Sequence, residues 1–150
     1  MTGSAQVRLV GPGDAPALAE LFAAIDATHF HPHPLTFNEA KKVVAYRGGD
    51  VYAVVAANGQ LAAYGLLRGW DEGFDVPSLG IAVRTDKLRL GYGRLLMHWL
   101  ADQARMRGAK RLRLRVNLAN VPARRMYESL GYADIGEDRG ERVMVLDLGG

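Results

Sequence analysis

The stretch SLGIAVRTDKLRLGYGRLL, residues 78–96, joins a strand to a helix through a polar loop. Residues 78–83 are apolar on both faces, which is typical of a strand in the middle of a sheet. A basic loop follows at residues 84–90, and Gly91 and Gly93 then open a helix with an apolar residue at every fourth position. This strand–loop–helix unit predicts an α/β fold.

The two glycines also suggest a ligand. Glycine lets a ligand approach the backbone closely, and the first turn of a helix presents unpaired N–H groups and positive charge to a phosphate. Arg89 and Arg94 flank the turn. The spacing is neither a Rossmann fingerprint, because Leu96 stands at the third glycine position, nor a P-loop. A tight turn without a ligand is the alternative.

The N-terminal half predicts a strand at residues 7–10, two helices and a hairpin. Asp14 is placed to cap the first helix, and the capping box Thr36-x-x-Glu39 opens the second. The strands 51–57 and 61–67 flank Asn58-Gly59, a strong signal for a two-residue hairpin.

The C-terminal half predicts a strand at residues 110–116 and a closing hairpin, 132–136 with 142–148. In the first strand, leucine and valine alternate with Arg111, Arg113 and Arg115. Asn120 is placed to cap the helix between strand and hairpin. The element order predicts a single α/β domain over residues 1–150, a mixed sheet with helices on both faces.

Composition narrows the function classes. The 150 residues include no cysteine, which excludes disulfides, zinc-thiolate sites and a cysteine nucleophile. A net charge of +3 suits an anionic ligand without requiring nucleic acid. The sequence predicts neither a signal peptide nor a membrane span, so we expect a cytoplasmic protein that does not bind membranes.

A second motif gives a family resemblance. Residues 120–132, Asn-Val-Pro-Ala-Arg-Arg-Met-Tyr-Glu-Ser-Leu-Gly-Tyr, match the pattern Asn-x-x-Ala-x-x-x-Tyr-x-x-x-Gly-Phe/Tyr. Together with Gly91 and Gly93, this segment resembles the GNAT superfamily of acyl-CoA-dependent N-acetyltransferases. The first family motif departs at Leu88, where glutamine or arginine is usual, and Arg89 stands one position later.

The resemblance implies a mostly antiparallel sheet that is splayed where acetyl-CoA binds, with acetyl-CoA as co-substrate and no metal. Backbone near Ala82 and Val83 would pair with the pantetheine arm. The pyrophosphate would rest on a loop and helix start, and Asn120 would contact the pantetheine. Tyr127 would protonate the leaving thiolate, although a tyrosine on this apolar stripe is ordinarily a core residue. The predicted pyrophosphate residues are Arg89, Leu90, Gly91, Tyr92, Gly93 and Arg94.

The acceptor side is less defined. An amine must lose a proton before it attacks, and the nearest carboxylates to the central strand are Asp71, Glu72 and Asp75 in the preceding loop. Asp71 and Glu72 are the candidate bases, with a solvated turn as the alternative. Predicted acceptor-binding residues are His29, His31, Trp70 and Phe74, and solvated loop histidines are equally consistent with the sequence.

Three readings of the whole chain follow. The first is an enzyme that transfers an acetyl group from acetyl-CoA to a primary amine of a small molecule, an amino sugar or a peptide. The second is a catalytically weak acyl-CoA-binding module of the same fold. The third, a nucleic-acid-binding domain, has little support because no aromatic residues interleave with the arginines. The resemblance also allows a homodimer.

Overall fold

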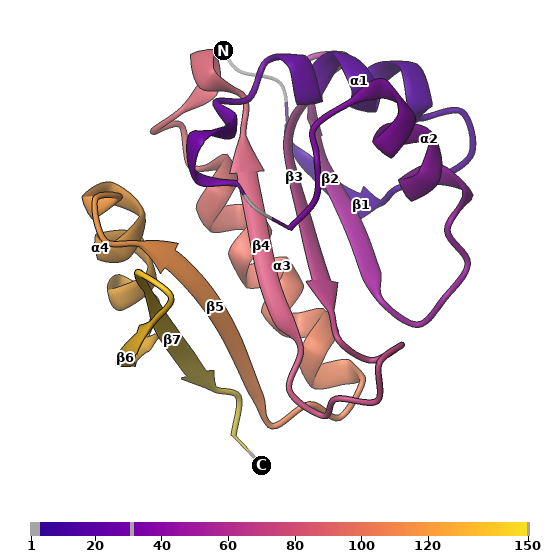
Figure 1. The fold of residues 1–150 in the computed structure, drawn as a ribbon. Coiled ribbons are helices and arrows are strands. Elements are labelled where there is room, and N and C mark those ends of the chain that lie inside the picture. The colour runs from indigo at the N-terminus through magenta and orange to yellow at the C-terminus, as the bar shows by residue number, and fades with distance from the viewer. Residues whose placement is uncertain (1–3, 31, 150) are drawn as a thin grey trace.

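The computed structural model describes residues 4–30 and 32–149, and its secondary structure is that of a mixed α/β domain (Figure 1). The helices and strands run in the order β1 (Gln6–Leu9), α1 (Ala15–Ala23), η1 (Ala27–His29), α2 (Phe37–Ala45), β2 (Val51–Ala57), β3 (Gln60–Arg68), β4 (Ser78–Val83), η2 (Thr85–Lys87), α3 (Tyr92–Met106), β5 (Arg111–Asn117), α4 (Val121–Ser129), β6 (Ala133–Asp138) and β7 (Glu141–Asp147).

The strands form one seven-stranded sheet in the order β1-β2-β3-β4-β5-β7-β6. Every neighbouring pair is antiparallel except β4 with β5, which is parallel. The expected mixed, mostly antiparallel sheet is therefore confirmed, and β4 is its middle strand as its apolar sequence predicted. Both predicted hairpins form, with positive φ at Asn58 and Gly59 in one turn and at Arg139 and Gly140 in the other.

Helices cover both faces of the sheet, but unequally (Figure 1). The core on one face joins α3 and α4 to strands from both halves of the sheet. The core on the other face joins α1 and α2 to residues of β2, β3 and β4 only. Within the described part of the chain, no helix covers that second face over β5, β7 and β6, and Ile135 is exposed there.

The sequence predicted side-chain caps at the starts of α1 and α2, and only the cap of α2 forms. The hydroxyl of Thr36 accepts a hydrogen bond from the amide of Glu39, so the predicted cap of α2 is confirmed. The prediction that the Asp14 side chain caps α1 is wrong. Its carboxylate instead accepts hydrogen bonds from Gly11 and from the guanidinium of Arg8, a charged partner that outcompetes the helix amides.

Candidate functional site

The central feature is an opening between β4 and β5. Only two residue pairs join these strands, Ser78 with Arg113 and Leu79 with Leu114. From there the two strands diverge (Figure 1), so the backbone of residues 80–83 on the β5 side has no ladder partner. Unpaired strand edges accept an extended ligand by backbone hydrogen bonds. Ala82 and Val83, predicted to contact the pantetheine, lie on this unpaired edge.

The N-terminus of α3 lies at the wide end of the opening. Gly91, the N-cap, has φ +90°, a left-handed conformation that suits glycine, and its side-chain position is open space. No side chain caps the helix, and the first intrahelical hydrogen bond runs from the Leu95 amide to the Gly91 carbonyl. The amides of Tyr92, Gly93 and Arg94 are therefore free for an anion.

Gly93 brings three elements together. A Cβ atom at this position would lie 3.4 Å from Cγ2 of Val83 and 3.9 Å from Cε of Met126. The first turn of α3 thus packs closely against the open end of β4 and against α4. Arg94 extends the contact, because its guanidinium donates a hydrogen bond of 3.0 Å to the hydroxyl of Ser129. The start of α3, the unpaired edge of β4 and the helix α4 therefore lie next to one another.

The loop before Gly91 is exposed and conformationally unusual. Arg89 has φ +65°, which is uncommon for a residue with a side chain and costs free energy. Leu90 is exposed beside it, whereas the ring of Tyr92 is buried in the α3 core and contributes only its backbone to the site.

Tyr127 on α4 is 8% exposed, and its hydroxyl has no hydrogen-bond partner among the described residues. Burial raises the pKa of Tyr127 to about 12, so the hydroxyl stays protonated at neutral pH. A protonated, unengaged hydroxyl is able to donate to a nearby anion. Asn120 uses its side-chain oxygen to cap α4, accepting from the Ala123 amide at 3.4 Å.

The loop between β3 and β4 separates the candidate acceptor residues. The carboxylate of Asp71 accepts hydrogen bonds from the Tyr46 hydroxyl and from the Gly49 amide, and these bonds lower the pKa of Asp71. Trp70 packs toward the α3 core with the guanidinium of Arg107 over its ring, 5.0 Å from the centroid. Both side chains are thereby committed to structural contacts.

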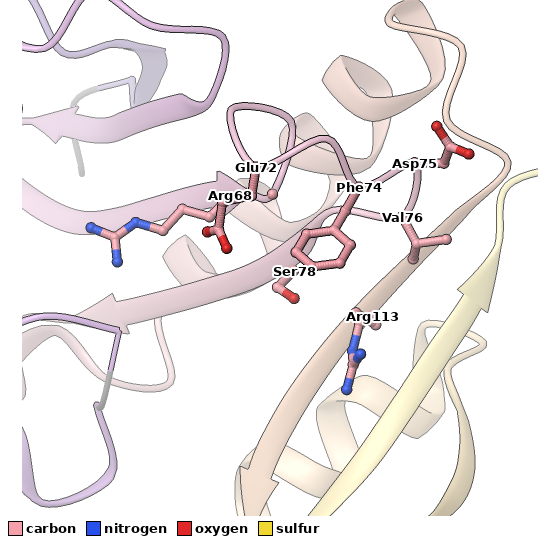
Figure 2. Close-up of a pocket in the computed structure, with 8 residues that line it drawn as sticks. Arg68, Glu72, Phe74, Asp75, Val76, Ser78 and Arg113 are labelled. Atoms are coloured by element: carbon pink, nitrogen blue, oxygen red, sulfur yellow. The ribbon is translucent and has the colours of Figure 1, made fainter.

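Unlike Asp71 and Trp70, the residues Glu72 and Phe74 line a hollow of about 410 Å³ at the narrow end of the opening (Figure 2). Its lining consists of Arg68, Gly69, Glu72, Phe74, Asp75, Val76, Ser78 and Arg113. The sequence singled out Glu72 and Phe74 as candidates, but not Arg68, Ser78 and Arg113, which line the same hollow. The alternation of arginines in β5 was the available signal for Arg113.

Two histidines were predicted to bind the acceptor, and both follow α1 in the sequence. His29 ends η1, and His31 lies outside the described residues. In the described ranges 4–30 and 32–149, no three histidine or acidic side chains cluster as they would around a metal ion. No helix within the same ranges is long and apolar enough to cross a membrane.

Comparison with known proteins connects this geometry to a family. The sequence model of the acetyltransferase (GNAT) family matches residues 17–132. The chain belongs to this family. GNAT enzymes take the acetyl group from acetyl-CoA, and the chain is an acyl-CoA N-acetyltransferase.

Relatives of this GNAT enzyme act on different amines. It is 32% identical over 108 residues to the [ribosomal protein bS18]-alanine N-acetyltransferase of Escherichia coli K12, covering 71% of this chain and 72% of that protein. It is 34% identical over 89 residues to streptothricin acetyltransferase of Streptomyces lavendulae, covering 58% of this chain and 46% of the relative.

Solved structures agree on the fold. The Escherichia coli ribosomal-protein-S18-alanine N-acetyltransferase superposes with a TM-score of 0.77 at 23% identity, over 98% of this chain and 96% of the other. The GNAT domain of S. lividans PAT superposes with a TM-score of 0.85 at 19% identity, over 97% and 91% of the two chains.

Proposed function

We propose that this GNAT enzyme transfers an acetyl group directly from acetyl-CoA to a primary amine, with Glu72 accepting the amine proton and Tyr127 donating a proton to the departing thiolate. The observation that carries the proposal is the opening between β4 and β5. It leads from the free amides at the start of α3 to a hollow lined by an unengaged carboxylate.

The residues present fit the donor. The free amides of Tyr92, Gly93 and Arg94 suit its pyrophosphate, and the unpaired edge at Ala82 and Val83 suits the amides of its pantetheine arm. Bound acetyl-CoA supplies an activated thioester carbonyl. The side chain of Asn120 is held by its capping bond, so we expect any contact from Asn120 to use its amide nitrogen.

Proton transfer has two sides. As the amine nitrogen bonds to the thioester carbon, the carbon–sulfur bond breaks and the nitrogen loses a proton. Glu72 is the better candidate to accept that proton, because its side chain has no partner among the described residues, whereas the Asp71 carboxylate is hydrogen-bonded to Tyr46 and Gly49. Tyr127 is the candidate that donates a proton to the thiolate sulfur, because its hydroxyl is protonated and makes no hydrogen bond to the described residues.

The acceptors named for the relatives, an alanine of ribosomal protein bS18 and streptothricin, are both amines. They support an amine acceptor without choosing between a peptide and a small molecule. Thiol release from acetyl-CoA, measured with a panel of peptides, amino acids and amino sugars, tests the proposal. Release that depends on an amine is the expected result, and CoA binding without release would instead support the acyl-CoA-binding module.

Comparing two variants tests the choice of base. Glu72→Gln should lower kcat/KM by about a hundredfold or more, the range for loss of a general base. Asp71→Asn removes a carboxylate that holds the loop, so we expect it to lower the melting temperature instead. A larger catalytic loss in Asp71→Asn than in Glu72→Gln would assign the base to Asp71.

A further inference from the structure

The hollow at the narrow end of the opening joins two walls of opposite charge. It lies where Ser78 of β4 pairs with Arg113 of β5. Leu112 and Leu114 point into the α3 core, so Arg113 between them projects from the opposite face. No helix of the described chain covers β5 on that face. An acceptor can therefore reach the thioester from this side while the donor occupies the side of α3.

Arg113 is the cation that remains available in this hollow. It is half-buried, and no hydrogen bond or ion pair engages its guanidinium within residues 4–30 and 32–149. Arg68, the other arginine of the lining, donates to the Tyr52 hydroxyl at 2.9 Å and to the Pro32 carbonyl at 2.7 Å. Figure 2 shows the guanidinium of Arg68 directed away from Arg113.

Of the two neighbouring arginines of β5, one adds positive charge beside Arg113. Arg115 is paired with Asp138, but Arg111 has no such partner in the described chain. A second hollow of about 440 Å³ on the same face is lined by Arg111 and Arg113 of β5 and by Glu137 and Asp138 of β6. It shares Arg113 and Val76 with the first hollow. An unpaired, half-buried guanidinium offers a forked pair of donors that matches a carboxylate.

The opposite wall is acidic and carries an aromatic ring. Glu72 and Phe74 both line this wall, and in the view of Figure 2 the Phe74 ring lies between the Glu72 and Arg113 side chains while the Asp75 carboxylate points away. Phe74 is 60% exposed, so its ring offers an apolar surface within the hollow. A positive ammonium group would be attracted to Glu72, a carboxylate to Arg113, and the carbon skeleton between them to Phe74.

We infer that the acceptor is an amine that also carries a carboxylate group, as an amino acid or an acidic peptide does, and that Arg113 selects it by binding that carboxylate. This inference rests on the proposed amine acetylation and adds the substrate class. Glu72 attracts the amine as a cation and then accepts the proton that the amine must lose. Arg113 fixes the far end of the molecule, which orients the amine toward the opening.

Matched acceptor pairs test the assignment. Each pair shares one amine and differs only in a carboxylate or its amide, for example 4-aminobutyrate against 4-aminobutyramide, or a peptide with Asp against Asn at its second position. In thiol-release assays, wild-type enzyme should prefer the carboxylate form at least about tenfold in kcat/KM. Arg113→Gln should reduce that preference to near unity, and Arg113→Lys should retain part of it.

Arg105→Gln is the matched control, because it removes the same charge from the far end of α3, where Arg105 pairs with Asp102. The preference should survive in that variant. Equal activity of wild type on both members of every pair, or a preference unaltered by Arg113→Gln, would overturn the inference while leaving amine acetylation intact. Absence of thiol release with every amine would overturn the proposed function itself.

Discussion

The Nε2 atom of His33 lies 2.7 Å from the hydroxyl oxygen of Tyr64, and both side chains are buried beneath α1. The other ring nitrogen of His33 faces the Pro34 carbonyl at 2.8 Å. A carbonyl only accepts, so Nδ1 carries the proton, Nε2 of the neutral ring accepts, and Tyr64 donates. This pair fastens the segment after η1 to the middle of β3.

The buried imidazole predicts acid sensitivity. Burial lowers the pKa of His33 below its ordinary value of about 6.5. Between the pKa of His33 in the folded chain and its pKa in the unfolded chain, the unfolded chain binds more protons. The contribution of His33 to the free energy of unfolding is therefore complete above about pH 6.5 and decreases as the pH falls. The fall is at most about 1.4 kcal/mol per pH unit. Urea denaturation from pH 7.5 to 5.0 measures it.

His33→Gln, which keeps a neutral polar side chain, should flatten this slope. His98→Gln removes an exposed imidazole on α3 and should leave the slope in place. An equally steep slope in His33→Gln would show that other groups cause the acid sensitivity.

Gly91→Asp should weaken CoA binding by at least about tenfold, since it adds a negative charge at the free end of α3 and a strained side chain at φ +90°. Gly108→Asp is the control, because Gly108 also has positive φ and open space but lies after the C-terminus of the same helix. Calorimetric titration with CoA measures both. Gly93→Asp should act similarly, since it adds the same negative charge within the first turn of α3. Unchanged affinity in folded variants would remove the phosphate site from α3.

Tyr127→Phe should lower turnover at saturating acetyl-CoA by up to about a hundredfold, the low end for loss of a general acid. The Tyr127 hydroxyl has no partner in the described chain but, unlike that of Tyr132, it is not fully shielded from solvent, so CoA affinity and melting temperature should change little. Steady-state rates beside a melting curve measure both effects. Wild-type turnover in this variant would make Tyr127 a packing residue, the alternative that its sequence position allowed.

Tyr132→Phe, in contrast to Tyr127→Phe, should change the stability of the fold. The Tyr132 hydroxyl is buried without a hydrogen-bond partner, and its ring lies 6.0 Å from that of Tyr127. Removing an unsatisfied buried hydroxyl should raise the free energy of unfolding by about 1 kcal/mol, or the melting temperature by roughly 2–4 °C. Tyr64→Phe, which removes a bonded hydroxyl, should instead destabilise. A melting temperature lowered by Tyr132→Phe would contradict this account.

Local chemistry made much of the fold predictable. Asn58-Gly59 supplies the two positive φ angles that its hairpin requires, Thr36 caps α2, and the apolar residues 78–83 predicted a central strand. These signals act over a few residues, so tertiary structure did not override them. The predicted cap by Asp14 is wrong because another nearby residue, Arg8, offers its carboxylate a stronger, charged partner.

The acceptor side resisted prediction because its contacts join distant parts of the chain. Nothing near Asp71 in the sequence shows that Tyr46, 25 residues earlier, engages its carboxylate. Trp70 and Phe74 share one loop, yet only Phe74 lines the hollow. Alternation predicted a common face for Arg111, Arg113 and Arg115, but whether a helix covers that face depends on the whole topology.

The two halves of the sheet meet along a seam of two residue pairs, Ser78 with Arg113 and Leu79 with Leu114. So short a seam leaves the shared core beneath α3 and α4 as the main link between the two halves of the sheet. A ligand that fills the opening would supply the hydrogen bonds that β4 and β5 do not give each other, and would make local opening of the sheet at this point less frequent. The lifetime of this enzyme against proteases would then follow the supply of its own acetyl donor.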